Sequence, residues 1–349
     1  MNTAFFLGAN TPGGFASFFG EWLDYGQLKR LYILKGTSGN GKSGFMRRVA
    51  KKLAAKGLDC ESILCSSDPA SLDGVYFPKS GVAFVDGTAP HVIEPRYPLA
   101  VDCWLPLTQF VDDGALAAER SGVVGLRDGL RDDYTRLSRV LAAVKTLQDE
   151  QRDLVLNGGT AETIARRARG FIRREIKKGS GGVLSKRFLS ALTPGGETVL
   201  WETADALADR IVELRDPFRL SDVFLRPLLE AALDAGQEAV ACYDPLAPAS
   251  RISHLILPGL RLAFTSAAYP GEPYRRVRLD AAVPREMMRR HRLRLRFLRR
   301  TEAALTEDAR GVLAGARDKH GRLEDIYNPH VDFIGVRALA DAYAERVLP

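Results

Sequence analysis

The chain has 349 residues, of which 46% are apolar and 27% are charged, a composition typical of a soluble globular protein with about two domains. No apolar stretch reaches the roughly 20 residues that a membrane-spanning helix requires, so we expect no insertion into a membrane. The four cysteines are too few and too irregularly spaced for a disulfide framework or a zinc site. Because no leader-like apolar segment is present either, these features predict a cytoplasmic protein.

The formal net charge of +7 is concentrated in two basic stretches, 166–178 and 285–300. Arginines in such stretches can bind nucleic acid or stabilise charge on a transferred phosphate, so both roles are considered. Charges of both signs begin at Arg299 and Glu302, and Phe297 is the one aromatic residue in the second stretch. This pattern favours a solvated helix face over a nucleic-acid interface. The oligomeric state is not predicted.

Helical and strand patterns alternate from the start of the chain. An amphipathic helix is expected over 15–25, an apolar strand over 31–34 and a second helix over 42–56. Two further apolar strands are expected at 62–65 and 82–85. Strands that alternate with helices predict an α/β fold with a parallel sheet covered by helices on both faces.

A block near the start of the chain occurs a second time. Residues 6–14 and 188–196 are identical at seven of nine positions, at an offset of 182. Shorter matches follow in the same order, which indicates a duplication. The second half accordingly repeats the expected elements, with helices at 198–210 and 223–235 and strands at 211–214, 239–243 and 261–265.

Each half ends in a long polar segment whose apolar residues recur at helical spacing, as at Leu137, Leu141 and Val144. We expect a helical hairpin packed on the α/β core of each half. The glycine-rich stretch 179–182 is interpreted as a linker. The predicted domains are therefore 1–180, with its hairpin at about 112–178, and 183–349, with its hairpin at about 284–348.

A glycine-rich loop follows the first apolar strand. It matches the G-x-x-x-x-G-K-S/T pattern of a P-loop, between an expected strand and an expected helix. Its glycines allow backbone N–H groups to surround a phosphate, and the helix N-terminus adds positive potential. Lys42 is expected to reach the β- and γ-phosphates. The residues predicted to bind the nucleotide are Gly36, Thr37, Ser38, Gly39, Asn40, Gly41, Lys42, Ser43 and Gly44.

A carboxylate is expected at the end of a later strand, where it holds Mg²⁺ together with the P-loop hydroxyl. The apolar strand 82–85 is followed directly by Asp86, and ligands bind at this edge of open α/β sheets. Ser43 and Asp86 are therefore the predicted Mg²⁺ ligands. The sequence predicts Mg²⁺-dependent binding of ATP, in preference to GTP, and its hydrolysis by a P-loop NTPase.

The residue that would activate water is not evident. Gly87 follows Asp86, where many ATPases have a glutamate. Asp68, Asp73, Glu94 and His91 are the candidate groups for this role. Asp68 and Asp73 have an alternative interpretation as turn formers, and His91 as a structural side chain. Transfer of phosphate to a small molecule is therefore the alternative reaction, and nucleotide-dependent binding of nucleic acid or protein is a third function.

The second half lacks the elements of the P-loop. Its aligned segment, 215–223, has neither the glycines nor the lysine, and Ser266 replaces Asp86. We expect that no phosphate nest forms there and that the chain has one nucleotide site.

A set of motifs extends across both halves: 8–15, 36–43, 65–69, 71–75 and 86–91, and more loosely 188–196 and the stretch from Met288 onward. They resemble a family of bacterial proteins with two tandem P-loop halves, usually described as ATPases or as nucleotide-kinase-like. The resemblance covers nearly the whole chain and implies a P-loop NTPase fold for each half. This sequence departs from the family pattern at its second loop.

Overall fold

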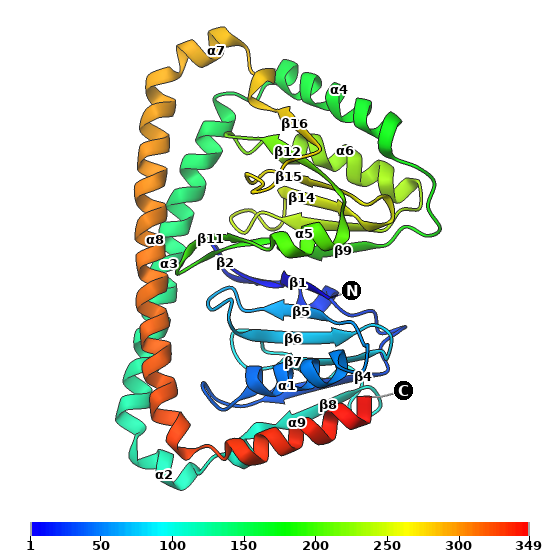
Figure 1. Cartoon of the computed structure of the whole chain (residues 1–349). Coiled ribbons are helices and arrows are strands. Elements are labelled where there is room, and N and C mark those ends of the chain that lie inside the picture. Colours follow the sequence, from blue (N-terminus) through cyan, green and yellow to red (C-terminus); the bar gives the residue numbers. More distant parts are fainter. Residues whose placement is uncertain (1, 348–349) are drawn as a thin grey trace.

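The computed structural model describes residues 2–347. Two α/β units lie one above the other, and two long helices run along one side of both units (Figure 1). Within the described range, no helix combines the length and the apolar character needed to cross a bilayer.

The first unit contains a six-stranded mixed sheet. Four strands run parallel to β4 (Arg30–Lys35), and β6 (Leu72–Phe77) runs antiparallel between β5 (Glu61–Leu64) and β7 (Val82–Asp86). The expectation of a wholly parallel sheet was therefore wrong, because 72–77 forms a strand that returns through a tight turn into β7. In spatial order the strands are β1 (Thr3–Phe6), β5 (Glu61–Leu64), β6 (Leu72–Phe77), β7 (Val82–Asp86), β4 (Arg30–Lys35) and β8 (Asp102–Pro106).

The second unit repeats this strand order, so the duplication is confirmed in three dimensions. Each unit also has a small hairpin around its Thr-Pro-Gly-Gly turn, β2 (Gly8–Thr11) with β3 (Gly14–Ser17), and β10 (Ser190–Thr193) with β11 (Gly196–Val199). The second sheet consists of β9 (Leu184–Arg187), β13 (Ala239–Tyr243), β14 (Ile252–Leu257), β15 (Leu262–Thr265), β12 (Arg210–Arg215) and β16 (Arg275–Arg278).

One expected helix is largely absent. The segment 15–25 forms β3 and a single 3₁₀ turn at Phe19–Glu21, because the hairpin hydrogen bonds to β2 hold its first residues extended. The helix expected at the equivalent place in the second unit is present as α5 (Trp201–Leu207).

Two long helices connect the units. Helix α3 (Arg120–Asp153) follows the short α2 (Asp113–Ala118), and α8 (Arg292–Tyr327) follows the short α7 (Arg285–Arg290). They pack antiparallel along their length, with ion pairs such as Arg294 to Glu150 and Lys319 to Asp133 (Figure 1). Each long helix therefore carries the chain from one unit to the other.

The helices that follow cover the opposite unit. Helix α4 (Gly158–Glu175) packs on α6 (Ser221–Asp234) of the second unit, and α9 (Phe333–Val347) packs on α1 (Lys42–Ala54) of the first (Figure 1). The expected hairpins on their own halves are thus replaced by a reciprocal exchange. Helical periodicity marks an apolar face, but it does not identify the face against which it packs.

The two units meet at equivalent residues. Phe6 and Phe188 donate backbone hydrogen bonds to each other's carbonyls, with N to O distances of 3.0 and 2.9 Å. Both rings are fully buried, and they pack with the equivalent pair Ala9 and Ala191. A pseudo-twofold axis therefore passes between Phe6 and Phe188, as in the isologous interface of a symmetric dimer.

We predict that Phe188→Ala lowers the free energy of unfolding by about 3 to 5 kcal/mol, because it leaves a cavity at the contact between the units. Urea denaturation measures this change. As a control, Ile334→Ala removes a side chain that is 74% exposed and should alter stability by no more than about 0.5 kcal/mol. Equal effects of the two substitutions would contradict the assignment of Phe188 to the central contact.

A buried histidine makes the second unit sensitive to acid. Burial lowers the pKa of His254 to about 4, and its ring lies between the hydroxyls of Ser190 and Thr265. Below pH 6.5 the unfolded chain takes up a proton at this residue, whereas the folded chain does not until about pH 4. The folded state therefore loses stability as the pH falls.

From this shift we predict that His254 alone removes about 3 kcal/mol from the free energy of unfolding between pH 6.5 and 4. Urea titrations at several pH values of the wild type and of His254→Gln measure the contribution as a difference. The variant should show a flatter dependence, whereas the exposed control His320→Gln should keep the wild-type slope. Parallel curves for the wild type and His254→Gln would refute the prediction.

Candidate functional site

The glycine-rich loop joins β4 to α1. Gly39 and Gly41 have φ values of 73° and 89°, a backbone region that favours glycine, and Gly41 is the N-cap of α1. Asn40 is fully buried, and a Cβ on Gly36 would lie 2.1 Å from its Nδ2. With its amide turned to match its neighbours, Asn40 donates to the Thr37 carbonyl at 2.9 Å and accepts from the Thr37 amide at 3.2 Å. The glycines thus allow a tight loop that closes around the buried Asn40 side chain, whose hydrogen bonds to Thr37 hold it in shape.

The predicted lysine and carboxylate lie together at this loop. Lys42 donates from Nζ to the Thr37 carbonyl at 2.5 Å and lies 3.7 Å from Asp86 Oδ2. Asp86 ends β7, directly beside Leu34 of β4 in the sheet register. Its other oxygen accepts hydrogen bonds from the amide and hydroxyl of Thr88, at 2.9 and 2.5 Å. The carboxylate is therefore oriented toward the lysine.

Ser43 connects the loop to a second segment. Its hydroxyl accepts hydrogen bonds from the Leu72 amide at 2.9 Å and from Arg47 at 2.8 Å. Arg47 also donates to the Ala70 carbonyl, so the segment 65–71 after β5 is held against the start of α1. Among the described residues, Ser43 makes no hydrogen bond to Asp86, and no cluster of three or more acidic, histidine or cysteine side chains could hold a metal.

Thr37, Ser38 and Gly44 are the remaining residues predicted to bind phosphate. Thr37 and Ser38 form the start of the loop, and both are half-buried. Gly44 lies in the first turn of α1, where a Cβ would meet no other atom within 4 Å.

The candidate catalytic residues divide into two groups. His91 Nε2 lies 3.1 Å from Asp73 Oδ2, and both side chains are buried. The His91 ring packs edge-on against Phe15 and Phe19, with ring centres 4.7 and 5.0 Å away. Asp68 instead lies in the segment 65–71, with Oδ1 3.5 Å from an Arg317 nitrogen on α8. The structure therefore pairs Asp73 with His91 and Asp68 with Arg317.

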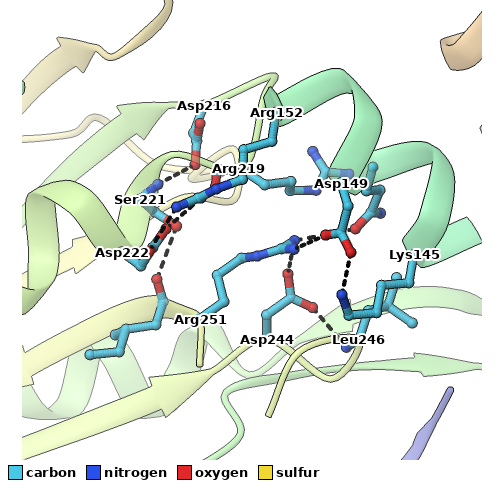
Figure 2. Close-up of polar contacts among 12 residues, drawn as sticks. Lys145, Asp149, Arg152, Asp216, Arg219, Ser221, Asp222, Asp244, Leu246 and Arg251 are labelled. Atoms are coloured by element: carbon cyan, nitrogen blue, oxygen red, sulfur yellow. Dashed lines mark hydrogen bonds and ion pairs between the residues drawn. The ribbon is translucent and has the colours of Figure 1, made fainter. Parts of the chain in front are cut away.

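The equivalent loop of the second unit forms an anion nest. The carboxylate oxygens of Asp216 accept hydrogen bonds from the amides of Leu220 and Ser221, both at 2.7 Å. Figure 2 shows the bond to Ser221. Arg219 has a φ of 58°, matching the left-handed conformation of Gly39. Burial raises the pKa of Asp216, against the opposing effect of these hydrogen bonds. An internal carboxylate thus occupies the amides to which a phosphate would bind, and the absence of a nucleotide site in this half stays a prediction.

The two loops occupy equivalent places in their units and have opposite chemistry. At an offset of 180, Gly36 stands where the second loop has Asp216, and Lys42 stands where it has Asp222. Asp222 forms an ion pair with Arg152 of α3, with an N to O distance of 2.7 Å (Figure 2). The first loop therefore has the same strand-loop-helix setting with no internal carboxylate and an added ammonium group.

Elements from the second half of the chain lie against the first loop. A Cβ on Gly39 would lie 2.7 Å from Asn328 Oδ1 and 3.2 Å from Glu324 Cα, and one on Gly41 would lie 3.3 Å from Val336. These three residues belong to the end of α8 and to α9. No local sequence signal marks them, since their position results from the exchange of helices.

Two surface hollows lie away from the loop. One, of about 430 Å³, lies between α4 and α6, and the other, of about 470 Å³, lies between α8 and the turn at Pro194. Neither contains a residue of 36–44. The end of α8 and the start of α9 occupy the space beside the loop glycines.

No family model, curated protein or solved structure matches the chain. The function is therefore inferred from the residues and contacts of the chain itself.

We predict that Asp216→Ala destabilises the protein by about 1 to 3 kcal/mol, because the buried amides of Leu220 and Ser221 lose their acceptor. Chemical denaturation measures the loss. The matched control Asp234→Ala removes an exposed carboxylate at the end of α6 and should stay within about 0.5 kcal/mol of the wild type. An Asp216→Ala variant as stable as this control would show that the nest does not need its carboxylate.

Proposed function

We propose that this chain binds ATP with Mg²⁺ at the loop 36–43 and hydrolyses it at this single site. The main support is the contrast between the two loops. In the second, two successive amides converge on the carboxylate of Asp216. The first has the same strand-loop-helix setting, with Gly36 in that position, so its amides remain available to an external anion. Four free cysteines agree with a reducing cytoplasm as its location.

The side chains around the loop fit a triphosphate with a magnesium ion. Lys42 is a cation beside the loop, poised between the Thr37 carbonyl and Asp86. Mg²⁺ prefers oxygen ligands and is commonly held by one or two protein groups, with phosphates and water completing its shell. The Ser43 hydroxyl and the Asp86 carboxylate would supply those two groups. The ion, when bound, would offset charge that develops on the phosphate oxygens.

Asp68 is the favoured candidate for orienting the attacking water. The Asp73 side chain is buried against His91, whereas the Asp68 side chain is 40% exposed and has Oδ1 3.5 Å from Arg317. The segment that carries Asp68 is tied to Ser43 through the Leu72 amide. A carboxylate and an arginine beside the P-loop are groups that can orient water and stabilise charge during phosphoryl transfer.

Phosphate transfer to a small molecule is the second candidate. Many ATPases have a glutamate that activates water directly after this aspartate, but here Gly87 follows Asp86 and no such carboxylate is present. Hydrolysis without an acceptor is then expected to be slow. ADP formation that depends on one compound from a panel of nucleosides and small metabolites would favour this alternative over hydrolysis.

We predict that Lys42→Ala lowers phosphate release from MgATP by about 100-fold or more, because the ammonium group no longer stabilises the transferred phosphate. Asp222→Ala changes the equivalent residue of the second loop and should retain turnover near the wild-type level. Steady-state phosphate release and calorimetric titration with ATP and GTP measure both variants. Circular dichroism verifies folding, since Asp222→Ala also breaks the ion pair with Arg152.

Equal loss of turnover in Lys42→Ala and Asp222→Ala would rule out a single site in the first unit. If the folded wild type takes up neither ATP nor GTP in magnesium buffer, the proposal as a whole fails.

A further inference from the structure

An excess of positive over negative charge gathers at one end of the molecule. We call this end, made of α4, β16, α7 and residues 292–300 of α8, the basic end (Figure 1). It contains 16 arginines and only 3 glutamates. Because the whole chain has a net charge of +7, the remainder of the molecule is net negative. The charge is therefore a local feature of one surface.

Contacts between these elements make the surface continuous. The Arg275 guanidinium of β16 lies 5.5 Å from the centre of the Phe171 ring of α4. Arg167 of α4 donates to the Arg278 carbonyl of β16 at 2.5 Å. At the other end of α4, the side chain of its N-cap Asn157 lies 4.0 Å from the Met287 sulfur of α7. The arginines thus lie on neighbouring elements.

Many of these arginines are exposed and have no acidic partner. Four of the arginines form ion pairs: Arg169 with Glu162, Arg276 with Glu213, Arg278 with Asp280 and Arg294 with Glu150. Within the part of the chain that the structure describes, no ion pair is formed by Arg166, Arg173, Arg275, Arg285, Arg289, Arg290, Arg292, Arg296 and Arg300. Unpaired charges at this density repel one another, so a polyanionic partner would stabilise this end.

We propose that the basic end binds the phosphodiester backbone of a nucleic acid. All of its cations are arginines, whose planar guanidinium groups match phosphate oxygens with paired hydrogen bonds. Two aromatic rings are exposed among them, Tyr274 at 47% and Phe297 at 55%, and such rings stack on unpaired bases. Helix α4 has 18 residues and is about 27 Å long, enough to follow several phosphates.

The surface fits a lipid bilayer less well. A helix that lies in a membrane interface presents a broad apolar face to the acyl chains. In 285–300, the exposed large apolar residues are only Leu293 and Phe297, and arginines surround them. Binding to anionic lipid in place of nucleic acid is therefore an outcome that the experiment must separate.

The test measures binding of labelled mixed-sequence RNA and DNA by fluorescence anisotropy without nucleotide. The oligonucleotides are single- or double-stranded and about 30 nucleotides long, several times the number of phosphates that α4 can follow. The full-length wild type is compared with Arg289→Gln/Arg290→Gln/Arg296→Gln/Arg300→Gln. We expect the variant to bind at least about 10-fold more weakly at low salt. The slope of log affinity against log salt should fall by about 0.7 for each phosphate of a single strand that the variant no longer neutralises.

The matched control removes four exposed cations distant from the basic end: Lys51→Gln/Arg120→Gln/Arg127→Gln/Arg337→Gln. It should retain most of the affinity, which separates a local surface from a general effect of net charge. Thermal unfolding followed by circular dichroism establishes that both variants are folded.

Three results would overturn the proposal: no oligonucleotide binding by the wild type at low salt, equal losses in the two quadruple variants, or binding only to phosphatidylserine-containing vesicles. None depends on the P-loop, because the assay contains no ATP. If no nucleic acid binds, the proposed ATPase activity is therefore unaffected. If no ATP is hydrolysed, the proposed nucleic-acid binding is likewise unaffected.

Discussion

The apolar face of α1 is buried by α9, and that of α6 by α4, so each unit takes a covering helix from the other half of the chain. Val336, Ala340 and Ala344 of α9 share a buried cluster with Phe45 and Met46 of α1. In the second unit, buried residues of α4 share a cluster with those of α6. Neither core is complete without the exchange, because removing either helix would expose a large apolar surface to water.

Through this exchange the second half of the chain also supports the glycine-rich loop 36–43 of the first unit. The loop glycines of the first unit lie against Asn328, Glu324 and Val336, which the chain reaches only after it has passed through the second unit. The start of α8 lies in the basic end, and its other end lies beside the loop 36–43. One continuous helix of 36 residues therefore joins the two surfaces to which we assign binding functions.

The two loops show how one backbone form serves opposite purposes. In the second unit, Asp216 fills the nest and the Arg152 to Asp222 pair locks the adjoining helix to α3. In that loop, the amides of Leu220 and Ser221 and the carboxylate of Asp222 all have partners within the chain, so its role is structural. In the first unit, Asn40 braces the loop from inside while Gly36 leaves out the carboxylate. The difference between a structural loop and a candidate binding site thus depends on very few side chains, above all Asp216 and Asp222 in place of Gly36 and Lys42.

The sequence alone determined the features that depend on neighbouring residues. The duplication, the strand before Gly36 and the helix after Gly41 are local patterns of apolar spacing and backbone freedom, and the structure contains all of them. The place of Asp86 beside Lys42 followed in the same way, since parallel strands end at one edge of a sheet. The antiparallel β6 was missed because its composition, with Asp73 and Gly74, is also that of a turn.

Tertiary structure decided which surfaces meet. The apolar face of a helix can pack against any complementary apolar surface. The sequence therefore contained no indication that α4 and α9 cover the opposite units. The pairing of Asp216 with two amides, the approach of Asn328 to Gly39 and the gathering of arginines from α4, β16 and α8 all join residues distant along the chain. Such contacts depend on where the whole chain brings each segment, and local composition does not encode that.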